Sequence, residues 1–260
     1  MTAETMPQAA AIGWPVLALM AGVAGAAGFI DAIAGGGGLL TVPSLALVGL
    51  PPHAILATNK GQSVFGSGMA LTRYAHSPLL ERRRAPLSFV CGLLGAGCGV
   101  LLVSQVSGAV LGPVIAALLT AVAIFMIFYR PPQVHGERVH RPWPVAALIA
   151  TVIATYDGFF GPGTGTFLIL SYVLVYKDRL DEASANAKVV NFASNLGALM
   201  LFALKGWVWW QVALPMAAGQ AVGGYLGAHV TVRVGRGLVR WAVVAISLAL
   251  VGRLAWQMLH

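Results

Sequence analysis

The sequence predicts an all-α protein: a polytopic transmembrane helical bundle of two inverted repeats, with helices that break at glycines. Of its 260 residues, 58% are hydrophobic and only 9% are charged, whereas soluble domains average about 25% charged residues. Apolar runs recur along the chain, many near the ~20 residues that cross a bilayer. A large soluble helical protein is excluded because its helices would need polar faces, and segments such as Gly108–Tyr129 have almost none.

Apolar runs and helix breakers predict five segments in each half, and about 8–10 membrane segments in all. In repeat 1 (12–129) the segments are 12–33, 39–50, 53–76, 86–104 and 108–129; in repeat 2 (143–258) they are 143–160, 166–176, 183–204, 211–231 and 237–258. A basic loop, 130–142, separates the repeats of this single transporter domain, 1–260. Segments 39–50 and 166–176 are too short to cross as straight helices. Ten crossings are favoured, and eight full spans with two re-entrant pieces remain the alternative.

The positive charges predict the topology, because cytoplasmic loops carry an excess of Lys and Arg. If all segments cross, four basic loops fall on one side, namely 77–85, 130–142, 177–182 and 232–240. If the short segments did not cross, we expect loops 205–210 and 232–240 to lie on the wrong sides. An odd number of crossings per half makes the two halves inverted, as in many transporters. The expected location is the inner membrane of the cell, as a multi-pass protein with the bilayer as partner.

The two halves share a pattern of rare residues. Asp31 precedes the glycine run Gly35–Gly38, and Asp157 precedes a second glycine-rich break that starts at Gly161. Lys60 matches Lys188 at an offset of 128 residues, while the aspartates match at an offset of 126. Charged residues inside a membrane are costly and usually functional, so this repetition predicts a functional site. Interfacial lysines that snorkel to the headgroups are the structural alternative.

Several candidate residues surround these charges. A helix that starts after a glycine break exposes free N–H groups and a positive dipole end, which together attract anions. The expected substrate-binding residues are Lys60, Lys188, Thr58, Asn59, Asn191, Asn195, Gly36, Gly37, Gly38, Gly163, Thr164 and Gly165. Asp31 and Asp157 are expected either to pair with the lysines or to carry protons, and a fixed structural ion pair is the other possibility.

The sequence shows no sign of an enzyme. It lacks a nucleotide-binding loop, a Gly-x-Ser-x-Gly elbow and metal-ligand spacing, so no catalytic residue, metal or cofactor is expected. The formal charge of +8 follows from the short basic loops and predicts topology rather than nucleic-acid binding.

Two pairs of motifs resemble the TauE/SafE family of membrane permeases. In the first half these are Gly28-Phe-Ile-Asp31 with its glycine run, and Ala57-Thr-Asn-Lys60 after Leu-Pro-Pro-His53. In the second half they are Tyr156-Asp-Gly-Phe-Phe-Gly-Pro-Gly-Thr-Gly165 and Asn186-Ala-Lys-Val-Val-Asn191. The resemblance implies movement of sulfur-containing anions such as sulfite and organosulfonates, often as export. The second break reads Gly-Pro-Gly-Thr-Gly, which departs from a plain glycine run and makes the two half-sites unequal.

The expected function is therefore secondary transport, by export, of a small anion such as sulfite, sulfoacetate or a similar organosulfonate. A transporter of another small organic anion, or an accessory subunit that moves nothing, remains an alternative. The sequence is also compatible with a homodimer.

Overall fold

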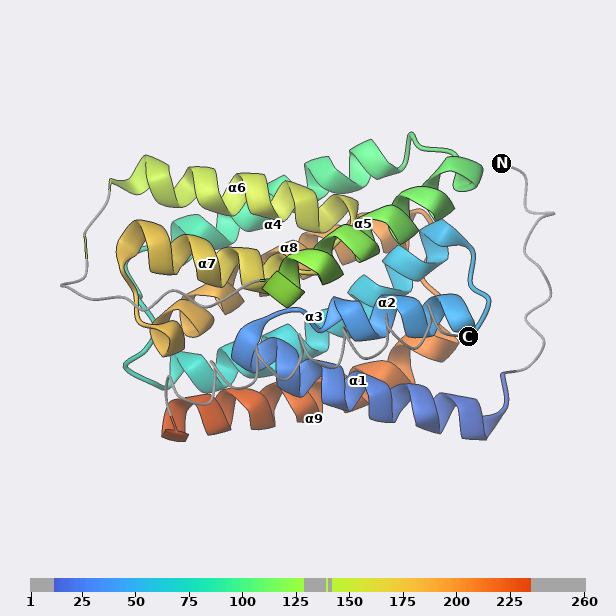
Figure 1. Ribbon diagram of the computed structural model, residues 1–260, viewed down its shortest axis with the longest axis horizontal. Coiled ribbons are helices and arrows are strands. Elements are labelled where there is room, and N and C mark those ends of the chain that lie inside the picture. Colours follow the sequence, from blue (N-terminus) through green and yellow to red (C-terminus); the bar gives the residue numbers. More distant parts are fainter. Residues whose placement is uncertain (1–11, 129–138, 140–141, 235–260) are drawn as a thin grey trace.

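The computed structural model describes residues 12–128, 139 and 142–234. This part of the chain forms nine α-helices and no strand (Figure 1). They are α1 (Trp14–Ala34), α2 (Gly38–Leu47), α3 (Pro52–Ala75), α4 (Ala85–Val103), α5 (Gly108–Phe128), α6 (Trp143–Phe159), α7 (Thr164–Tyr176), α8 (Leu180–Leu204) and α9 (Trp210–Val234). The predicted all-α class is confirmed, and the expected segment 237–258 lies outside the described residues.

Helix starts follow local chemistry. Pro15, Pro52, Pro86 and Pro144 lie in the first turns of α1, α3, α4 and α6, where proline costs no hydrogen bond. Helix α8 starts at Leu180 rather than near 183, because Asp181 and Glu182 belong to its first turn. Acidic residues stabilise the N-terminal end of a helix. Because they also interrupt the apolar run, hydropathy does not predict this first turn of α8.

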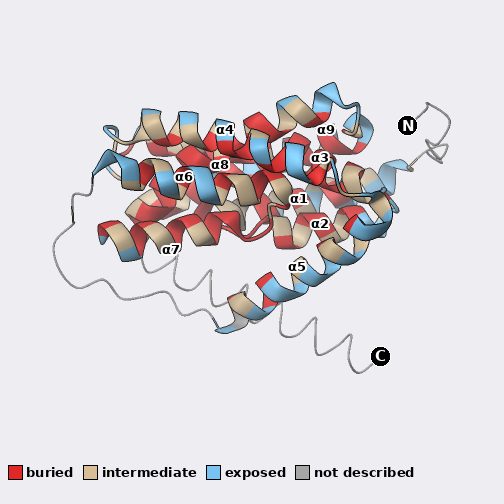
Figure 2. Ribbon diagram, turned by 90° about the horizontal axis from the view of Figure 1, so that it is seen from above, coloured by how far each residue is buried: buried red, intermediate tan, exposed pale blue. Residues whose placement is uncertain are grey.

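The distribution of side chains is that of a membrane protein. Leu19, Leu148 and Val222 are more than half exposed on the outer surface, whereas Lys60 and Lys188 are buried inside. Figure 2 shows the buried residues along the centre of the bundle and the exposed residues on its outward faces. Four described helices, α1, α4, α5 and α8, are long and apolar enough to cross a membrane.

Helices α1 and α2 form a hairpin that enters and leaves at the same end of the bundle. Gly25 lies against Gly219, and Phe29 lies against Gly227, so α1 and α9 run in the same direction. The start of α9 follows Trp207, whose ring packs on His53 at the start of α3 with centroids 4.5 Å apart. We call this the Trp207 end. Because α1 begins there and α3 begins there, α2 must return to it (Figure 1).

Helices α6 and α7 form a second hairpin that enters from the opposite end. The Val139 N–H, just before α6, donates to the Tyr176 carbonyl at the end of α7. The Arg84 guanidinium stacks on the rings of Tyr172 and Tyr176, so we call this the Arg84 end. In Figure 1 the α1–α2 and α6–α7 pairs point toward each other from the two sides of the bundle.

The tips of the two hairpins meet inside the protein. A Cβ atom added at Gly165 would lie 2.6 Å from the Gly35 Cα atom, and the Thr166 hydroxyl donates to the Ala34 carbonyl at 3.1 Å. Gly35 and Gly163 have φ angles of 75° and 87°, which side chains rarely tolerate. The glycines therefore permit both the sharp break and the contact between the tips.

The hairpins correct the expected topology. Helices α2 and α7 return to the end at which α1 and α6 entered, so the ten-crossing reading is wrong for these two pairs. We expected that loops 205–210 and 232–240 would lie on the wrong sides if the short segments did not cross, and this is also wrong. A hairpin and a double crossing leave the chain on the same side, so the charge pattern cannot distinguish them.

The charge asymmetry itself is present in the structure. Among the described residues, the lysines and arginines outside the interior lie at the Arg84 end with the exception of Lys205. The positive-inside rule then predicts that the Arg84 end faces the cytoplasm. Inversion of the complete halves stays a prediction, because repeat 2 is described only as far as residue 234.

One helix of each half packs mainly against the other half. Helix α4 lies on α6 and α8, and α9 lies on α1 and α3. Glycines make both contacts close: Gly95 approaches the Thr151 carbonyl, and Gly219 approaches the Ala21 carbonyl. Such contacts between small residues are typical of membrane helices. Among the described helices, α1–α3 with α9 form one bundle and α6–α8 with α4 form another, and each bundle uses helices from both halves.

Candidate functional site

The first ion pair of the site joins the two halves. Lys60 Nζ on α3 lies 2.7 Å from Asp157 Oδ1 on α6, and both side chains are at most 3% exposed. The Thr164 hydroxyl donates to Oδ1 at 2.7 Å, and the Ser194 hydroxyl donates to Oδ2 at 2.5 Å. Lys60 also donates to Asn195 Oδ1 at 3.1 Å. The Asp157 carboxylate therefore accepts from three side chains, which is the requirement for burying a charge.

The second ion pair also crosses between the halves but is less enclosed. Lys188 Nζ on α8 lies 2.5 Å from Asp31 Oδ2 on α1, and their side chains are 1% and 20% exposed. The other carboxylate oxygen, Oδ1, accepts a longer bond of 3.3 Å from the Gly37 N–H. In the structure each lysine therefore pairs with the aspartate of the other half.

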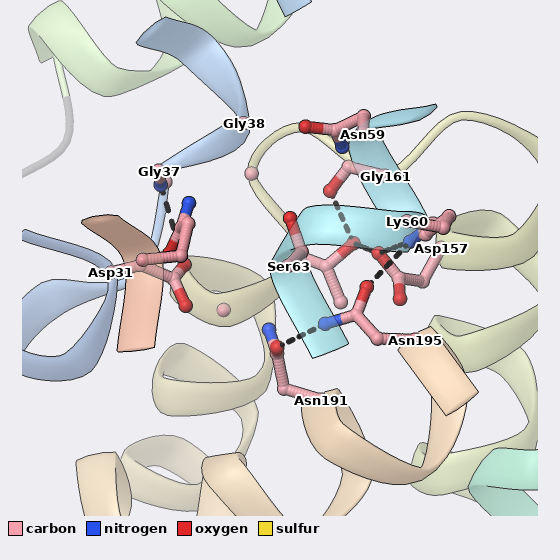
Figure 3. Close-up of a pocket in the computed structure, with 15 residues that line it drawn as sticks. Asp31, Gly37, Gly38, Asn59, Lys60, Ser63, Asp157, Gly161, Asn191 and Asn195 are labelled. Atoms are coloured by element: carbon pink, nitrogen blue, oxygen red, sulfur yellow. Dashed lines mark hydrogen bonds and ion pairs between the residues drawn. The ribbon is translucent and has the colours of Figure 1, made fainter. Parts of the chain in front are cut away.

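A cavity lies between the hairpin tips, α3 and α8 (Figure 3). It is lined by Asp31, Gly36, Gly37, Gly38, Asn59, Lys60, Ser63, Asp157, Gly161, Gly163, Thr164, Gly165, Asn191, Asn195 and Gln220. Most of the residues expected from the sequence therefore surround one cavity. Its walls come from both bundles, since α3 belongs to one bundle and α8 belongs to the other.

The amide side chains present N–H groups to this cavity. The Asn59 oxygen accepts from the Thr41 hydroxyl at 2.6 Å and from Gln62 Nε2 at 2.9 Å. The Asn191 oxygen accepts from Asn195 Nδ2 at 2.8 Å. Within the described part of the chain, Nδ2 of Asn59 and Nδ2 of Asn191 have no hydrogen-bond acceptor among the bonds found. Because their oxygens are occupied, both amides offer donors to the cavity.

Two of the expected residues do not line the cavity. Thr58 is fully buried, and its hydroxyl accepts a hydrogen bond of 3.0 Å from the Trp209 N–H. It precedes Asn59 on the helix, and the two side chains point about 100° apart around the helix axis, so Thr58 faces the α8–α9 loop. Lys188 reaches the cavity only through Asp31. Both were expected to contact substrate directly, and the structure corrects this.

Gln220, like Ser63 and Gly161, lines the cavity but was not among the residues expected from the sequence. It lies on α9, is 3% exposed, and no side-chain hydrogen bond to it is found among the described residues. Its Oε1 atom lies against Gly28 and Gly66, where a Cβ atom would overlap it. A glutamine in the middle of an apolar segment was the available signal, because uncompensated polar groups are rare in membranes.

The charges of the site cancel. Two lysines and two aspartates carry no net charge together, so the attraction for an anion comes from N–H donors and from the positive ends of α2 and α7. Those helices start at Gly38 and Thr164, beside the cavity. Helix starts of this kind bind anions with backbone N–H groups. In the described residues, no three His, Cys, Asp or Glu side chains gather as a metal site.

Comparison with known proteins identifies the family of the chain. The family model described as "Sulfite exporter TauE/SafE" matches residues 19–254. The chain belongs to the TauE/SafE family. A "Probable membrane transporter protein" of Haemophilus influenzae is 35% identical over 248 residues, covering 95% of this chain and 97% of that protein. The "Probable membrane transporter protein YfcA" of Escherichia coli K12 is 35% identical over 237 residues, covering 90% and 88%.

A third TauE/SafE relative, the "Probable membrane transporter protein ORF9" of a Sinorhizobium species, is 35% identical over 252 residues, or 96% of each chain. No solved structure matches this chain. The protein is therefore a multi-pass membrane transporter of the TauE/SafE family.

Proposed function

We propose that this protein is a secondary transporter that moves small sulfur-containing anions, namely sulfite, sulfoacetate or similar organosulfonates, across the inner membrane of the cell, in the direction of export. The observation that carries the proposal is the donor-lined cavity between the hairpin tips. The family description supplies the substrate class as a hypothesis, and the chemistry of the cavity supports an anion.

The donors suit a sulfo group. Asn59 and Asn191 offer side-chain N–H groups, and the breaks before α2 and α7 offer backbone N–H groups. A sulfonate or sulfite has three oxygens that spread its charge, and several N–H groups from different directions satisfy them better than one lysine does. Lys60 stays paired with Asp157, so its charge is compensated and the N–H donors hold the anion.

The two-bundle architecture supports transport by alternating access. The cavity lies where the α1–α3 and α9 bundle meets the α6–α8 and α4 bundle. Rocking of one bundle against the other would expose the cavity first to the Arg84 end and then to the Trp207 end, which is the mechanism of transporters built from inverted repeats. The contacts that must change are those between α3 and α8 and those between the hairpin tips.

Flux measurements with labelled substrate test this proposal. We expect proteoliposomes with the wild-type protein to move labelled sulfite or sulfoacetate, and we expect the combined variant Asn59→Leu with Asn191→Leu to lose most of that flux. Lys60→Ala and Lys188→Ala should each reduce it strongly. Gln211→Leu, at an exposed position at the start of α9, is the matched control and should keep wild-type flux.

Two outcomes would overturn the proposal. Absence of flux with sulfite, sulfoacetate and other small organic anions, in vesicles where the protein is folded, would favour an accessory subunit. Flux of a different organic anion that depends on Asn59 and Asn191 would keep the transporter and replace its substrate class.

A further inference from the structure

We propose that Asp31, and not Asp157, takes up a proton whenever the cavity binds a monoanion, so that the anion and the proton move together. This inference rests on the proposed anion transport. It assigns unequal roles to two aspartates that occupy matching positions in the two halves.

Hydroxyl donors distinguish the two carboxylates. Asp157 accepts from Thr164 and Ser194. At the repeat offsets of 126 and 128, the positions that match Thr164 and Ser194 in the first half are Gly38 and Gly66. Neither glycine has a side chain that could donate. Hydrogen bonds from hydroxyl groups stabilise an ionised carboxylate, and Asp157 accepts two of them, whereas no hydroxyl donor to Asp31 is found among the described residues.

Gln220 occupies the space that a hydroxyl-bearing side chain at position 66 would need. A Cβ atom at Gly66 would lie 3.2 Å from the Gln220 Cβ atom and would overlap the Gln220 amide oxygen. At Gly66, the position that matches Ser194 in the first half, the space for a side chain is thus filled by an amide from another helix. The amide lines the cavity instead of binding the Asp31 carboxylate.

Access to protons also favours Asp31. Its side chain is 20% exposed, against 3% for Asp157. Its Oδ2 atom holds Lys188, but among the described residues its Oδ1 atom accepts only the 3.3 Å bond from Gly37. Oδ1 is therefore the atom to which a proton from water in the cavity would be added, with Lys188 still bound to Oδ2.

The charge balance links this proton to the anion. Lys60, Lys188, Asp31 and Asp157 together carry no net charge, so a bound monoanion leaves one negative charge in a low-dielectric interior. An unbalanced buried charge is strongly unfavourable. Protonation of Asp31 restores neutrality and removes one negative charge from the cavity wall, so the proton and the anion bind cooperatively.

Other ionisable groups on the helices around α1 do not replace Asp31 in this role. Lys188 on α8 is its direct partner, and the Tyr74 hydroxyl on α3 donates to the Ala32 carbonyl. Three other charged or titratable side chains on these helices have partners other than Asp31: Lys60 pairs with Asp157, Arg73 with His229, and Asp181 with Arg179.

The test counts protons taken up per anion bound by the purified full-length protein. Methanesulfonate is the probe because its sulfonate stays ionised, so any proton must be held by the protein. Calorimetry in two buffers of different ionisation enthalpy gives the proton count. We expect about one proton per anion for the wild type, from the charge balance, and none for Asp31→Asn, whose binding should also lose its pH dependence.

Paired variants keep the test valid if Asp31→Asn does not fold, because removing both partners leaves no unpaired buried charge. Asp31→Asn with Lys188→Gln should abolish proton uptake, whereas the matched control, Asp157→Asn with Lys60→Gln, should retain it per anion bound. Uptake that persists without Asp31, or that disappears only without Asp157, would overturn the inference. If methanesulfonate binds and is transported without proton uptake, the inference about Asp31 is overturned but the proposed function stands. If methanesulfonate, sulfite and sulfoacetate are neither bound nor transported, the proposed function is overturned.

Discussion

The pairing of each lysine with the aspartate of the other half gives the sharpest prediction for stability. Lys60 and Asp157 are 2.7 Å apart and at most 3% exposed. Removing one partner of such a buried pair leaves an uncompensated charge and costs about 3–5 kcal/mol. We therefore expect Lys60→Met or Asp157→Asn alone to destabilise the protein by about this amount. The double variant should lose much less than the sum, with a coupling energy of about 2–3 kcal/mol.

The comparison within one half is the control. Lys60 and Asp31 belong to the same half and line the same cavity, but no ion pair joins them. Their coupling energy should be at most about 1 kcal/mol. Unfolding in mixed micelles with rising dodecyl sulfate, followed by circular dichroism, gives the free energies for both cycles. A larger coupling for Lys60 with Asp31 than for Lys60 with Asp157 would refute the pairing.

Three further variants test other contacts. Ser194→Ala removes a 2.5 Å hydrogen bond to a buried carboxylate and should lower the free energy of unfolding by about 1.5–3 kcal/mol. Its control, Ser44→Ala, removes a bond to the Leu40 carbonyl of its own helix and should change the free energy of unfolding by at most about 0.5 kcal/mol. Equal effects of the two variants would contradict the role given to Ser194. Gly219→Ala places a Cβ atom against the Ala21 carbonyl and should destabilise the protein by about 1–3 kcal/mol. In the control, Gly22→Ala, the added Cβ atom meets open space, and stability should change by at most about 1 kcal/mol. Thermal unfolding measures both variants. Gln220→Ala should weaken sulfite binding about tenfold by removing one hydrogen bond, and unchanged affinity in titration calorimetry would exclude Gln220 from the site.

Much of the fold could be predicted from the sequence because the signals are local. Apolar runs, prolines and glycines mark where helices start and end, and the nine described helices lie where those signals place them. The hairpins could not be predicted, because a hairpin and a double crossing place the basic loops on the same side. The exchange of α4 and α9 between the bundles was equally hidden, since these helices are apolar on most faces and their sequences do not show which neighbour they choose.

The candidate site was predictable to the extent that its residues are rare in membranes. Intramembrane Asp31, Lys60, Asp157 and Asn191 stand out from the apolar background, and the structure brings them to one cavity. The sequence does not show which lysine pairs with which aspartate, because this depends on tertiary packing. Thr58 was misassigned because residues next to each other on a helix face different directions, so being adjacent to a lining residue does not place a side chain in the cavity.

Locating a bound anion would test the central claim most directly. Selenite is the selenium analogue of sulfite, and its anomalous scattering marks its position in a crystal. We predict a selenium peak between the two hairpin tips, within hydrogen-bonding distance of Asn59 Nδ2 and Asn191 Nδ2, which sulfite should displace. A peak confined to the arginines at the Arg84 end, with the cavity empty under conditions where the protein moves selenite, would contradict the account.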